Sequence, residues 1–399
     1  MVRDRPHQPS ALVATFTFPP DLNGVAKASS TCARILLDAG WKVEIATAPA
    51  KTNRKEMRWR GARVHEFDVE GTQDDQQRRD AIIAGYRDFL RNGLWDVIIF
   101  EGYGWPLQLA VPLLPKIKAK KVLVSHGYAA LRWFWVRKFP FGLGQWARST
   151  LKSFSMLRWA RYINRWVFLS HQCDFDAFFD HTLARFIRHP GIRVIPNGVE
   201  PVDYTQTPRS FRSAHHIPED AFVFLCVAYY SQGKDQGFAV KAFRKANIPA
   251  SVLVFIGTEF NEWSRKFQKM DDDIPATSKC GRIVWLDKQT REDTLSAFRE
   301  SDAFVLSSKL ETQPISILES MSFAKPWIGR KAGCIASLPA GVCVTSQLSM
   351  AKAMSKIASN PDLRSKSSQE GLQAASEVYS LRKNAASYNE MLAEILAAG

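Results

Sequence analysis

The chain has 399 residues and a mass of 45.1 kDa, more than one ordinary hydrophobic core needs, so its length predicts two domains. Its composition, 46% hydrophobic and 23% charged, excludes a wholly disordered protein. The net charge of +15 is uneven: residues 1–198 contain 30 Lys and Arg against 17 Asp and Glu, and the residues after them contain 24 against 22. We therefore expect a polyanion or an anionic surface to meet the first half of the chain only.

The apolar runs and the cysteines narrow the class of protein further. The polar start, MVRDRPHQPS, is not expected to be a signal peptide. No run approaches the roughly 18 apolar residues of a membrane-spanning helix. The six cysteines are scattered without a C-x-x-C pair, which is typical of reduced, mostly buried thiols in a cytoplasmic protein and not of a zinc site or a disulfide framework.

Short apolar runs alternate with amphipathic stretches along the whole chain. Nine runs predict strands, at 11–16, 42–47, 96–100, 121–125, 166–169, 222–228, 252–256, 282–286 and 303–307. Helical patterns lie between them, for instance at 26–39, 235–247, 291–300 and 315–324. Continuous apolar runs suit strands that helices cover on both faces. The alternation therefore predicts an α/β fold with two doubly wound parallel sheets.

A stretch rich in turn-forming and polar residues, at about 195–220, separates the two sets of strands. We place the domains at 1–197 and 198–376. An amphipathic helix within 377–399 follows, and the sequence leaves its packing open, with the first domain as one candidate. Two such domains in tandem place a ligand cleft between the carboxyl ends of both sheets.

The segment 301–324 carries the most informative pattern of polar residues. A strand is expected to end near Ser307, and Pro314 then opens a helix at a position where its missing N–H costs nothing. The amides at a helix N-terminus can hold a phosphate. Glu311 precedes this helix and Glu319 lies about one turn into it, so both carboxylates are placed to accept hydrogen bonds from sugar hydroxyls around a bound diphosphate. Taken alone, such a pair also fits a solvent-facing loop and a helix surface.

This segment resembles the E-x7-E element of retaining GT-B glycosyltransferases of family 4, and reads Ser308-Lys-Leu-Glu311-Thr-Gln-Pro314-Ile-Ser-Ile-Leu-Glu319. Four more stretches resemble the family in the right order: Pro19-Pro-Asp-Leu-Asn-Gly24-Val-Ala, His126-Gly127, Val194-Ile-Pro-Asn-Gly-Val199 and Lys234 before a helix. Several motifs in order are more specific than any one of them. The resemblance implies a GT-B fold, in which two Rossmann-like domains face each other across a cleft and the second binds the nucleotide sugar.

The resemblance also implies a role for each matching residue. Glu319 binds the ribose hydroxyls, Glu311 contacts the donor sugar near its reacting face, and Lys234 neutralises the diphosphate as charge develops on the leaving group. Gly24 lets backbone amides approach the phosphates, which a Cβ would obstruct. His126 contacts the donor sugar or its β-phosphate, the structural alternative being a strand-end histidine that caps a loop. The implied catalytic residues are Glu311, His126 and Lys234. The implied donor-binding residues are Asn23, Gly24, Lys234, Gln313, Pro314, Ile315 and Glu319.

The sequence departs from the family pattern at three places. The stretch 227–233 lacks the arginine that often precedes the lysine, which leaves Lys234 as the one cationic side chain expected on the diphosphate from this domain. Asn23 replaces the first of two glycines, and Thr312-Gln313 replace Gly-Phe. These departures bear on donor preference and on activity, and an inactive homologue is the alternative.

Two acidic clusters raise a metal-dependent alternative. Asp174-Phe-Asp176 and Asp271-Asp272-Asp273 have the D-x-D spacing with which glycosyltransferases of the other major fold hold a divalent cation. Asp174 follows a strand and opens a helix, which favours a helix cap. The run 271–273 is expected in a polar surface loop. We therefore expect no metal site and no cofactor, with a UDP- or GDP-sugar as the co-substrate.

Residues 131–168 form a basic, aromatic segment with eight Lys and Arg, five Trp and no Asp or Glu. Trp and Arg together favour a membrane–water interface with anionic lipid. Single-stranded nucleic acid and a core-facing aromatic helix with a solvated basic face are the alternatives. The residues expected to meet the acceptor or the membrane are Arg132, Trp133, Trp135, Arg137 and Lys138.

The expected function is that of a retaining, metal-independent hexosyltransferase. It would move a hexosyl unit from a nucleotide sugar to a lipid-linked, lipopolysaccharide-like or cell-surface glycan acceptor, in the cytoplasm and peripheral on the inner face of the membrane. The alternatives are a nucleotide-sugar epimerase or another enzyme on this fold, and a non-catalytic basic protein that binds membrane or nucleic acid. No helix-turn-helix or RNA-binding signature accompanies the charge, so nucleic acid is not expected as a partner. The sequence leaves the oligomeric state open.

Overall fold

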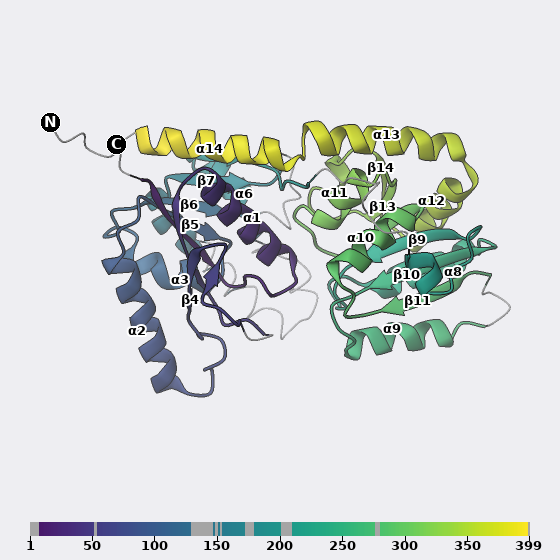
Figure 1. Cartoon of the computed structure of the whole chain (residues 1–399), viewed down its shortest axis with the longest axis horizontal. Coiled ribbons are helices and arrows are strands. Elements are labelled where there is room, and N and C mark those ends of the chain that lie inside the picture. Colours follow the sequence, from purple (N-terminus) through teal and green to yellow (C-terminus); the bar gives the residue numbers. More distant parts are fainter. Residues whose placement is uncertain are drawn as a thin grey trace. The chain divides into compact units, whose positions relative to one another are not determined.

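The computed structural model describes residues 8–51, 54–128, 147, 151, 154–171, 179–200, 210–275 and 280–397. The chain divides into two compact units (Figure 1). Unit 1 comprises Met1–Ile195 with Ala385–Gly399, and unit 2 comprises Pro196–Asn384. In the part of the chain that is described, no helix is long and apolar enough to cross a membrane.

Unit 1 is built on an eight-stranded sheet with the order β3-β4-β2-β1-β5-β6-β7-β8. Its pairs are parallel except β3 with β4, which is antiparallel. The strands are β1 (Ser10–Thr15), β2 (Lys42–Thr47), β3 (Arg58–Trp59), β4 (Ala62–Glu66), β5 (Val97–Glu101), β6 (Lys120–Val124), β7 (Arg165–Phe168) and β8 (Ile192–Val194). The strand order reverses between β1 and β5, and such a reversal opens a crevice at the carboxyl ends of the two strands.

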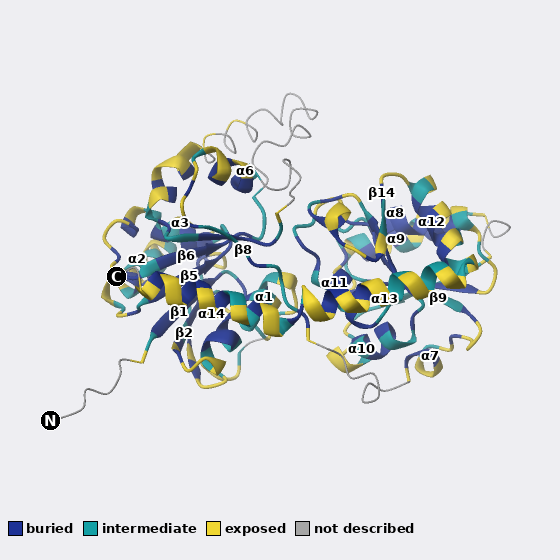
Figure 2. Ribbon diagram, turned by 90° about the horizontal axis from the view of Figure 1, so that it is seen from above, coloured by how far each residue is buried: buried dark blue, intermediate teal, exposed yellow. Residues whose placement is uncertain are grey.

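Both faces of this sheet are buried. Leu12 and Ile98 join a core with residues of α2, α3 and α6, while the alternate residues Val13 and Ile99 are equally inaccessible on the opposite face. The helical elements are α1 (Gly24–Asp38), α2 (Gln76–Asn92), α3 (Trp105–Ala110), η1 (Val111–Leu113), η2 (Ala160–Tyr162), α6 (Phe179–Phe186) and the later part of α14 (Leu381–Ala397). Figure 2 shows the buried strands between these more exposed helices.

The C-terminal helix α14 contributes to the core of unit 1. It buries Tyr388, Met391, Leu392 and Ile395. Its exposed Glu394 accepts hydrogen bonds from Arg165 on β7 at 3.3 Å and from Arg193 on β8 at 2.5 Å.

Unit 2 is built on a six-stranded, entirely parallel sheet with the order β11-β10-β9-β12-β13-β14. Its strands are β9 (Phe222–Val227), β10 (Ser251–Ile256), β11 (Arg282–Leu286), β12 (Ala303–Leu306), β13 (Trp327–Arg330) and β14 (Gly341–Val344). Here the order reverses between β9 and β12, so the two loops that follow these strands flank the crevice of this unit.

Two cores lie on opposite faces of this second sheet. Val223 and Leu225 pack with α10, α11 and α13, and the alternate residues Phe224 and Cys226 pack with α8 and α12. The helical elements are α7 (Phe211–Ala214), α8 (Gln236–Ala246), α9 (Glu262–Asp272), α10 (Arg291–Glu300), α11 (Ile315–Ser322), η4 (Ile335–Ser337), α12 (Gln347–Ser359), α13 (Pro361–Glu377) and the start of α14. The predicted α/β fold with two doubly wound parallel sheets is therefore confirmed.

All nine predicted strands are present, and the described residues form five more that were not predicted: β3, β4, β8, β13 and β14. For the acidic run 271–273, the expected exposure to solvent is confirmed for Asp272 and Asp273, and the expectation was wrong for Asp271. Asp271 lies in α9 and is buried, because Arg244 of α8 donates to both of its carboxylate oxygens at 2.6 and 2.8 Å. The other cluster, Asp174 and Asp176, lies outside the described residues.

The basic, aromatic segment is only partly described. Arg132, Trp133, Trp135, Arg137 and Lys138 lie outside the described residues. For two later tryptophans the interfacial interpretation was wrong, because Trp159 and Trp166 are 7% and 0% exposed within the core of unit 1. Arg165 pairs with Glu394 and thus contributes to the fold.

Candidate functional site

In unit 1, the loop after β1 leads into α1 through Asn23 and Gly24. The side-chain oxygen of Asn23 accepts a hydrogen bond from the Ala26 amide at 2.9 Å and so caps the helix. Asn23 therefore has a structural role as the cap of α1. Gly24 is the first residue of α1, and a Cβ at this position would meet no atom within 4 Å. Packing within the protein therefore does not require the glycine.

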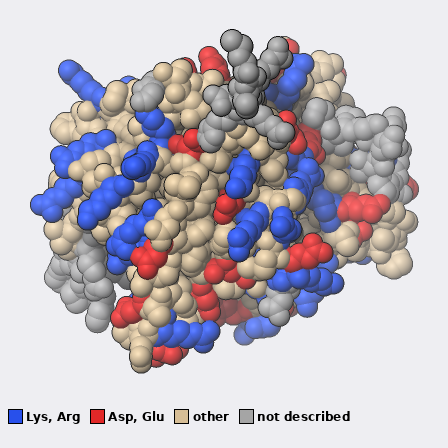
Figure 3. Space-filling model, turned by 60° about the vertical axis from the view of Figure 1, so that its left-hand side comes forward, with Lys and Arg blue, Asp and Glu red and all other residues tan. Residues whose placement is uncertain are grey.

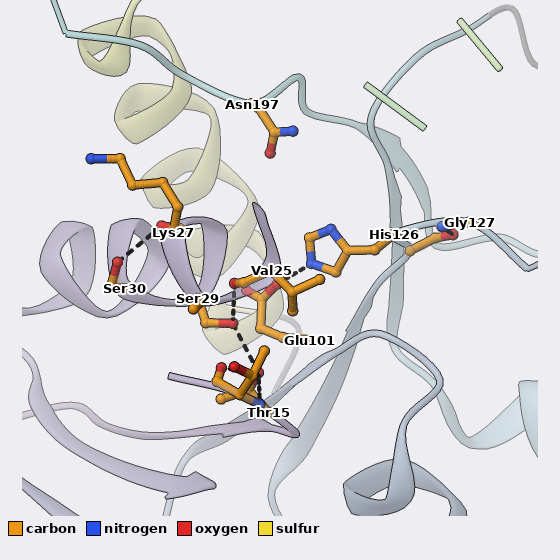
Figure 4. A network of polar contacts seen from close by, with 12 residues as sticks. Thr15, Val25, Lys27, Ser29, Ser30, Glu101, His126, Gly127 and Asn197 are labelled. Carbon is orange, nitrogen blue, oxygen red and sulfur yellow. Dashed lines mark hydrogen bonds and ion pairs between the residues drawn. The ribbon is translucent and has the colours of Figure 1, made fainter. Parts of the chain in front are cut away.

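The neighbouring strands β5 and β6 end in a buried acid–base pair. The Glu101 carboxylate is almost inaccessible and lies 2.7 Å from Nε2 of His126, whose side chain is 14% exposed. Figure 4 shows this pair beside the first turns of α1, where Ser29 donates a hydrogen bond to the carbonyl of Val25 and lies 3.0 Å from the Thr15 hydroxyl. A carboxylate at this distance fixes the orientation of the imidazole ring.

A second network supports the loop that carries His126. Ser125 and Tyr103 both donate to Oδ2 of Asp180, the latter at 2.9 Å, and Ser125 Oγ accepts from the Gly127 amide at 3.1 Å. Gly127 has a φ of +91°, a conformation that L side chains rarely adopt. Burial raises the pKa of Asp180 to about 6, so its ionisation in the fold is costly and depends on these donors.

In unit 2, the loops after β9 and β12 meet through an ion pair. Lys234 Nζ donates to Glu311 Oε1 at 2.5 Å, with side chains that are 19% and 10% exposed. The ammonium also lies over the ring of Tyr229, 5.4 Å from its centroid. Because β9 and β12 flank the reversal of the strand order, this pair stands where a parallel α/β sheet binds its ligands.

Asn197, in the motif Val194-Ile-Pro-Asn-Gly-Val199, holds the start of α11 in place. The Asn197 amide donates to Gln313 Oε1 at 2.6 Å, and the Asn197 side chain donates to the Gln313 carbonyl at 3.2 Å. Gln313 is consequently only 6% exposed. Pro314 was predicted as the first helical residue of α11. It is instead the N-cap, the position just before, and the helix begins at Ile315.

Glu319 lies one turn into α11, as predicted, and its side chain is 12% exposed. One of its carboxylate oxygens accepts a hydrogen bond from Arg291, the first residue of α10. Since Arg291 is half-exposed, a ligand hydroxyl can replace it at the carboxylate at small cost. Among the described residues, no three His, Cys, Asp or Glu side chains are grouped as metal ligands are.

Two family models match the chain in succession. Residues 23–198 match the glycosyl transferase 4-like domain, and residues 209–373 match the glycosyl transferases group 1. The chain belongs to the group 1 glycosyltransferases. Among curated protein sequences no match is found.

Solved structures share the fold of this group 1 glycosyltransferase. Sucrose-phosphate synthase from Thermosynechococcus elongatus has a TM-score of 0.79 at 15% identity, with 98% of this chain and 100% of that chain covered. HepE from Anabaena, solved with UDP and glucose, has a TM-score of 0.74 at 13% identity, covering 97% and 100%. WaaG, a glycosyltransferase involved in lipopolysaccharide biosynthesis, has a TM-score of 0.65 at 16% identity, covering 95% and 99%. The glycosyltransferase therefore has the GT-B fold.

The structure thus groups the predicted residues of the glycosyltransferase within each unit. Unit 1 holds Asn23, Gly24 and His126 at the carboxyl edge of its sheet, and unit 2 holds Lys234 and the segment 311–319 at its own. Sequence reasoning missed four charged residues that pair with these or lie beside them: Glu101, Arg291, Lys309 and Arg330. One signal was available for Glu101, because strands ending at 100 and 125 in one parallel sheet bring the residues after them to the same edge.

Proposed function

We propose that the protein is a retaining hexosyltransferase that takes its sugar from a nucleoside diphosphate and transfers it to a lipid-linked or lipopolysaccharide-like glycan. The observation that carries this proposal is the Lys234–Glu311 pair at the β9/β12 reversal, with Glu319 one turn into the helix that follows Glu311. A cation and two carboxylates at such an edge suit a ligand that combines a diphosphate with the hydroxyls of two sugars. The structure of HepE with UDP and glucose supports a nucleotide sugar as the donor class.

In this proposal the chemistry is divided among the residues of unit 2. Glu319 exchanges Arg291 for the ribose hydroxyls, and Glu311 accepts a hydrogen bond from the donor sugar. Lys234 then neutralises the diphosphate as the bond between its oxygen and the anomeric carbon breaks, so the reaction needs no metal ion. The acceptor hydroxyl forms its new bond on the same face of the sugar, and its proton passes to the departing diphosphate oxygen.

The residues of unit 1 orient the sugar and the phosphates. Gly24 leaves open space beside the first turn of α1, so the backbone can approach a phosphate as a larger residue could not. His126, held by Glu101 at 2.7 Å, donates or accepts a hydrogen bond at the donor sugar. Glu101 is in this sense a positioning residue for His126.

An acceptor carried by a membrane fits the surface of unit 1. Residues 102–173 contain no Asp or Glu. Three large apolar side chains are exposed among the described residues of this segment: Leu151 is 71% accessible, and Phe154 and Leu157, in the helical stretch 154–159, are 62% and 39% accessible. Figure 3 shows one face on which Lys and Arg side chains gather in groups. Exposed apolar side chains in a stretch of sequence that is rich in Lys and Arg and has no acidic residue suit an anionic bilayer surface, so we place the protein in the cytoplasm, peripheral on the inner membrane face.

A thermal-shift screen with UDP-, GDP- and ADP-sugars tests the donor class. The proposal predicts that one nucleotide class raises the melting temperature of the wild type and that the double variant Lys234→Ala, Glu319→Ala loses this response. A wild type that responds to none of them, or full transferase activity of the double variant, contradicts the proposal. Product analysis without an acceptor excludes or reveals an epimerase, which would still convert the nucleotide sugar.

Flotation with liposomes tests the membrane part separately. The wild type is expected to float with vesicles of anionic phospholipid at low salt and less with neutral vesicles, and Phe154→Asp is expected to reduce flotation. The control is Leu94→Asp, since Leu94 is 94% exposed and lies outside the segment 102–173. No flotation of the wild type with anionic vesicles, or equal loss in both variants, contradicts it.

A further inference from the structure

The loop after β9, which lacks the expected arginine, is hydrogen-bonded through residues 232–234 to the loop after β12. The Lys309 amide donates to the Gly233 carbonyl at 2.8 Å, and Ser307 Oγ donates to the Lys234 carbonyl at 3.0 Å. Lys309 Nζ also donates to the Gln232 carbonyl at 3.2 Å. These bonds bring a second lysine to the loop that carries Lys234.

The three cations beside these two loops, Lys234, Lys309 and Arg330, differ in their partners and in their exposure to solvent. Lys234 is committed to Glu311 at 2.5 Å and is largely buried. The Asp235 carboxylate lies between two cations, Arg330 at 2.9 Å and Lys309 at 3.3 Å. The Lys309 side chain is 46% exposed, against 19% for Lys234 and 27% for Arg330, so Lys309 is the most accessible of the three cations.

We propose that Lys309 supplies the second positive charge on the donor diphosphate, in place of the arginine missing from 227–233. This inference rests on the proposed function. Lys234 alone compensates only part of the charge of a diphosphate, because it is a single cation that is also paired with Glu311. Lys309 gives up only long, exposed contacts when it turns to a phosphate, and such contacts contribute little to stability.

Arg330 remains paired with Asp235 and is not expected to contact the diphosphate. Its guanidinium lies over the ring of Phe238, 4.5 Å from the centroid, while it donates to Asp235. It therefore stays in place and keeps Asp235 compensated when Lys309 moves, which avoids leaving a carboxylate unpaired. Asp235 lies directly before α8, and its hydrogen bond from Arg330 at 2.9 Å does not depend on Lys309.

The test compares a nucleoside diphosphate with its nucleoside. Affinities of UDP, GDP and ADP, and of uridine, guanosine and adenosine, are measured by calorimetry for the wild type, Lys309→Ala, Lys309→Arg and the control Lys366→Ala, whose side chain is 75% exposed on α13. For the diphosphate that binds the wild type, Lys309→Ala is expected to lose roughly tenfold in affinity, as for one charge-assisted contact. The affinity for the matching nucleoside stays unchanged, and Lys309→Arg and Lys366→Ala bind as the wild type does.

A merely structural lysine gives a different pattern. If Lys309 only latches the two loops, Lys309→Ala weakens diphosphate and nucleoside equally, and this result overturns the inference. Unchanged diphosphate affinity of Lys309→Ala overturns it as well and leaves the proposed function intact. A wild type that binds none of the three diphosphates overturns the proposed function, and the inference with it.

Discussion

Asp180 gives the sharpest prediction about the loop that carries His126. Its fully buried carboxylate accepts hydrogen bonds from Tyr103 and Ser125, and burial raises its pKa to about 6. Asp180→Asn removes the charge and leaves an oxygen that accepts the same hydrogen bonds. Because the asparagine does not ionise, the pH dependence of the difference in stability between variant and wild type reports the cost of burying the charged carboxylate.

The magnitude follows from the two pKa values of Asp180, about 6 in the fold and 3.8 ordinarily. Between these values the folded chain holds a proton that the unfolded chain has lost, so the free energy of unfolding of the wild type falls as the pH rises. The whole loss amounts to about 3 kcal/mol, and about 1–2 kcal/mol of it falls between pH 5 and pH 8. The asparagine has no such dependence. Relative to the wild type, Asp180→Asn should thus gain about 1–2 kcal/mol of stability over this range.

Urea unfolding at pH 5, 6.5 and 8 and constant ionic strength measures this difference. Tryptophan fluorescence is a suitable signal because Trp166 Nε1 donates to the Tyr103 hydroxyl at 2.9 Å, within the same network. The matched control is Asp88→Asn on α2, whose carboxylate is 62% exposed, and its difference from the wild type should stay flat. A flat or falling difference for Asp180→Asn would refute the reasoning.

Three further changes have expected outcomes. Gly24→Ala should leave the free energy of unfolding within about 1 kcal/mol, since a Cβ there meets no atom, and should raise the donor KM several-fold in a transfer assay. Arg291→Ala should alter the free energy of unfolding by less than about 1 kcal/mol, because the Arg291 side chain is half-exposed, and should tighten nucleotide binding in a calorimetric titration by freeing Glu319. Buried His189 accepts from the Gly191 amide and faces two carbonyls, and burial lowers its pKa. Thermal unfolding should therefore show a stability that is lost as the pH falls below about 6.5, and a weaker loss in His189→Gln.

Each of these three predictions has a result that would contradict it. An unchanged donor KM for Gly24→Ala would remove Gly24 from the donor site. Weaker nucleotide binding by Arg291→Ala would make Arg291 a ligand of the nucleotide and not a competitor of it. An equal loss of stability at acid pH in His189→Gln and the wild type would assign the pH dependence to other groups.

The fold could be predicted because the central strands are continuous apolar runs that the sequence alone reveals. Residues 222–228 and 252–256 are apolar at every position, as strands buried on both faces must be. The missed strands lack that signal. β4 alternates buried and exposed residues near the sheet edge, and β13 has only four residues, with Gly329 and Arg330 among them.

The site was predictable where motifs fix local geometry and not where partners come from afar. Glu311 and Glu319 lie as predicted because one loop and one helix turn separate them. Asp271 was misplaced because its partner Arg244 is 27 residues away, and the acidic run alone resembles a surface loop. Glu101 was missed because it is the charged last residue of β5, and the apolar run that predicts this strand ends one residue earlier, at Phe100.

The most direct measurement for the central claim is a calorimetric titration of three proteins: the wild type, Glu319→Ala and the control Lys366→Ala. The ligand is the nucleotide sugar that raises the melting temperature of the wild type most. The account predicts saturable binding to the wild type and the control. It predicts a loss of roughly 10- to 100-fold in Glu319→Ala, the cost of hydrogen bonds from the ribose to a charged acceptor. Equal affinities for all three proteins, or no binding to the wild type, would contradict the account.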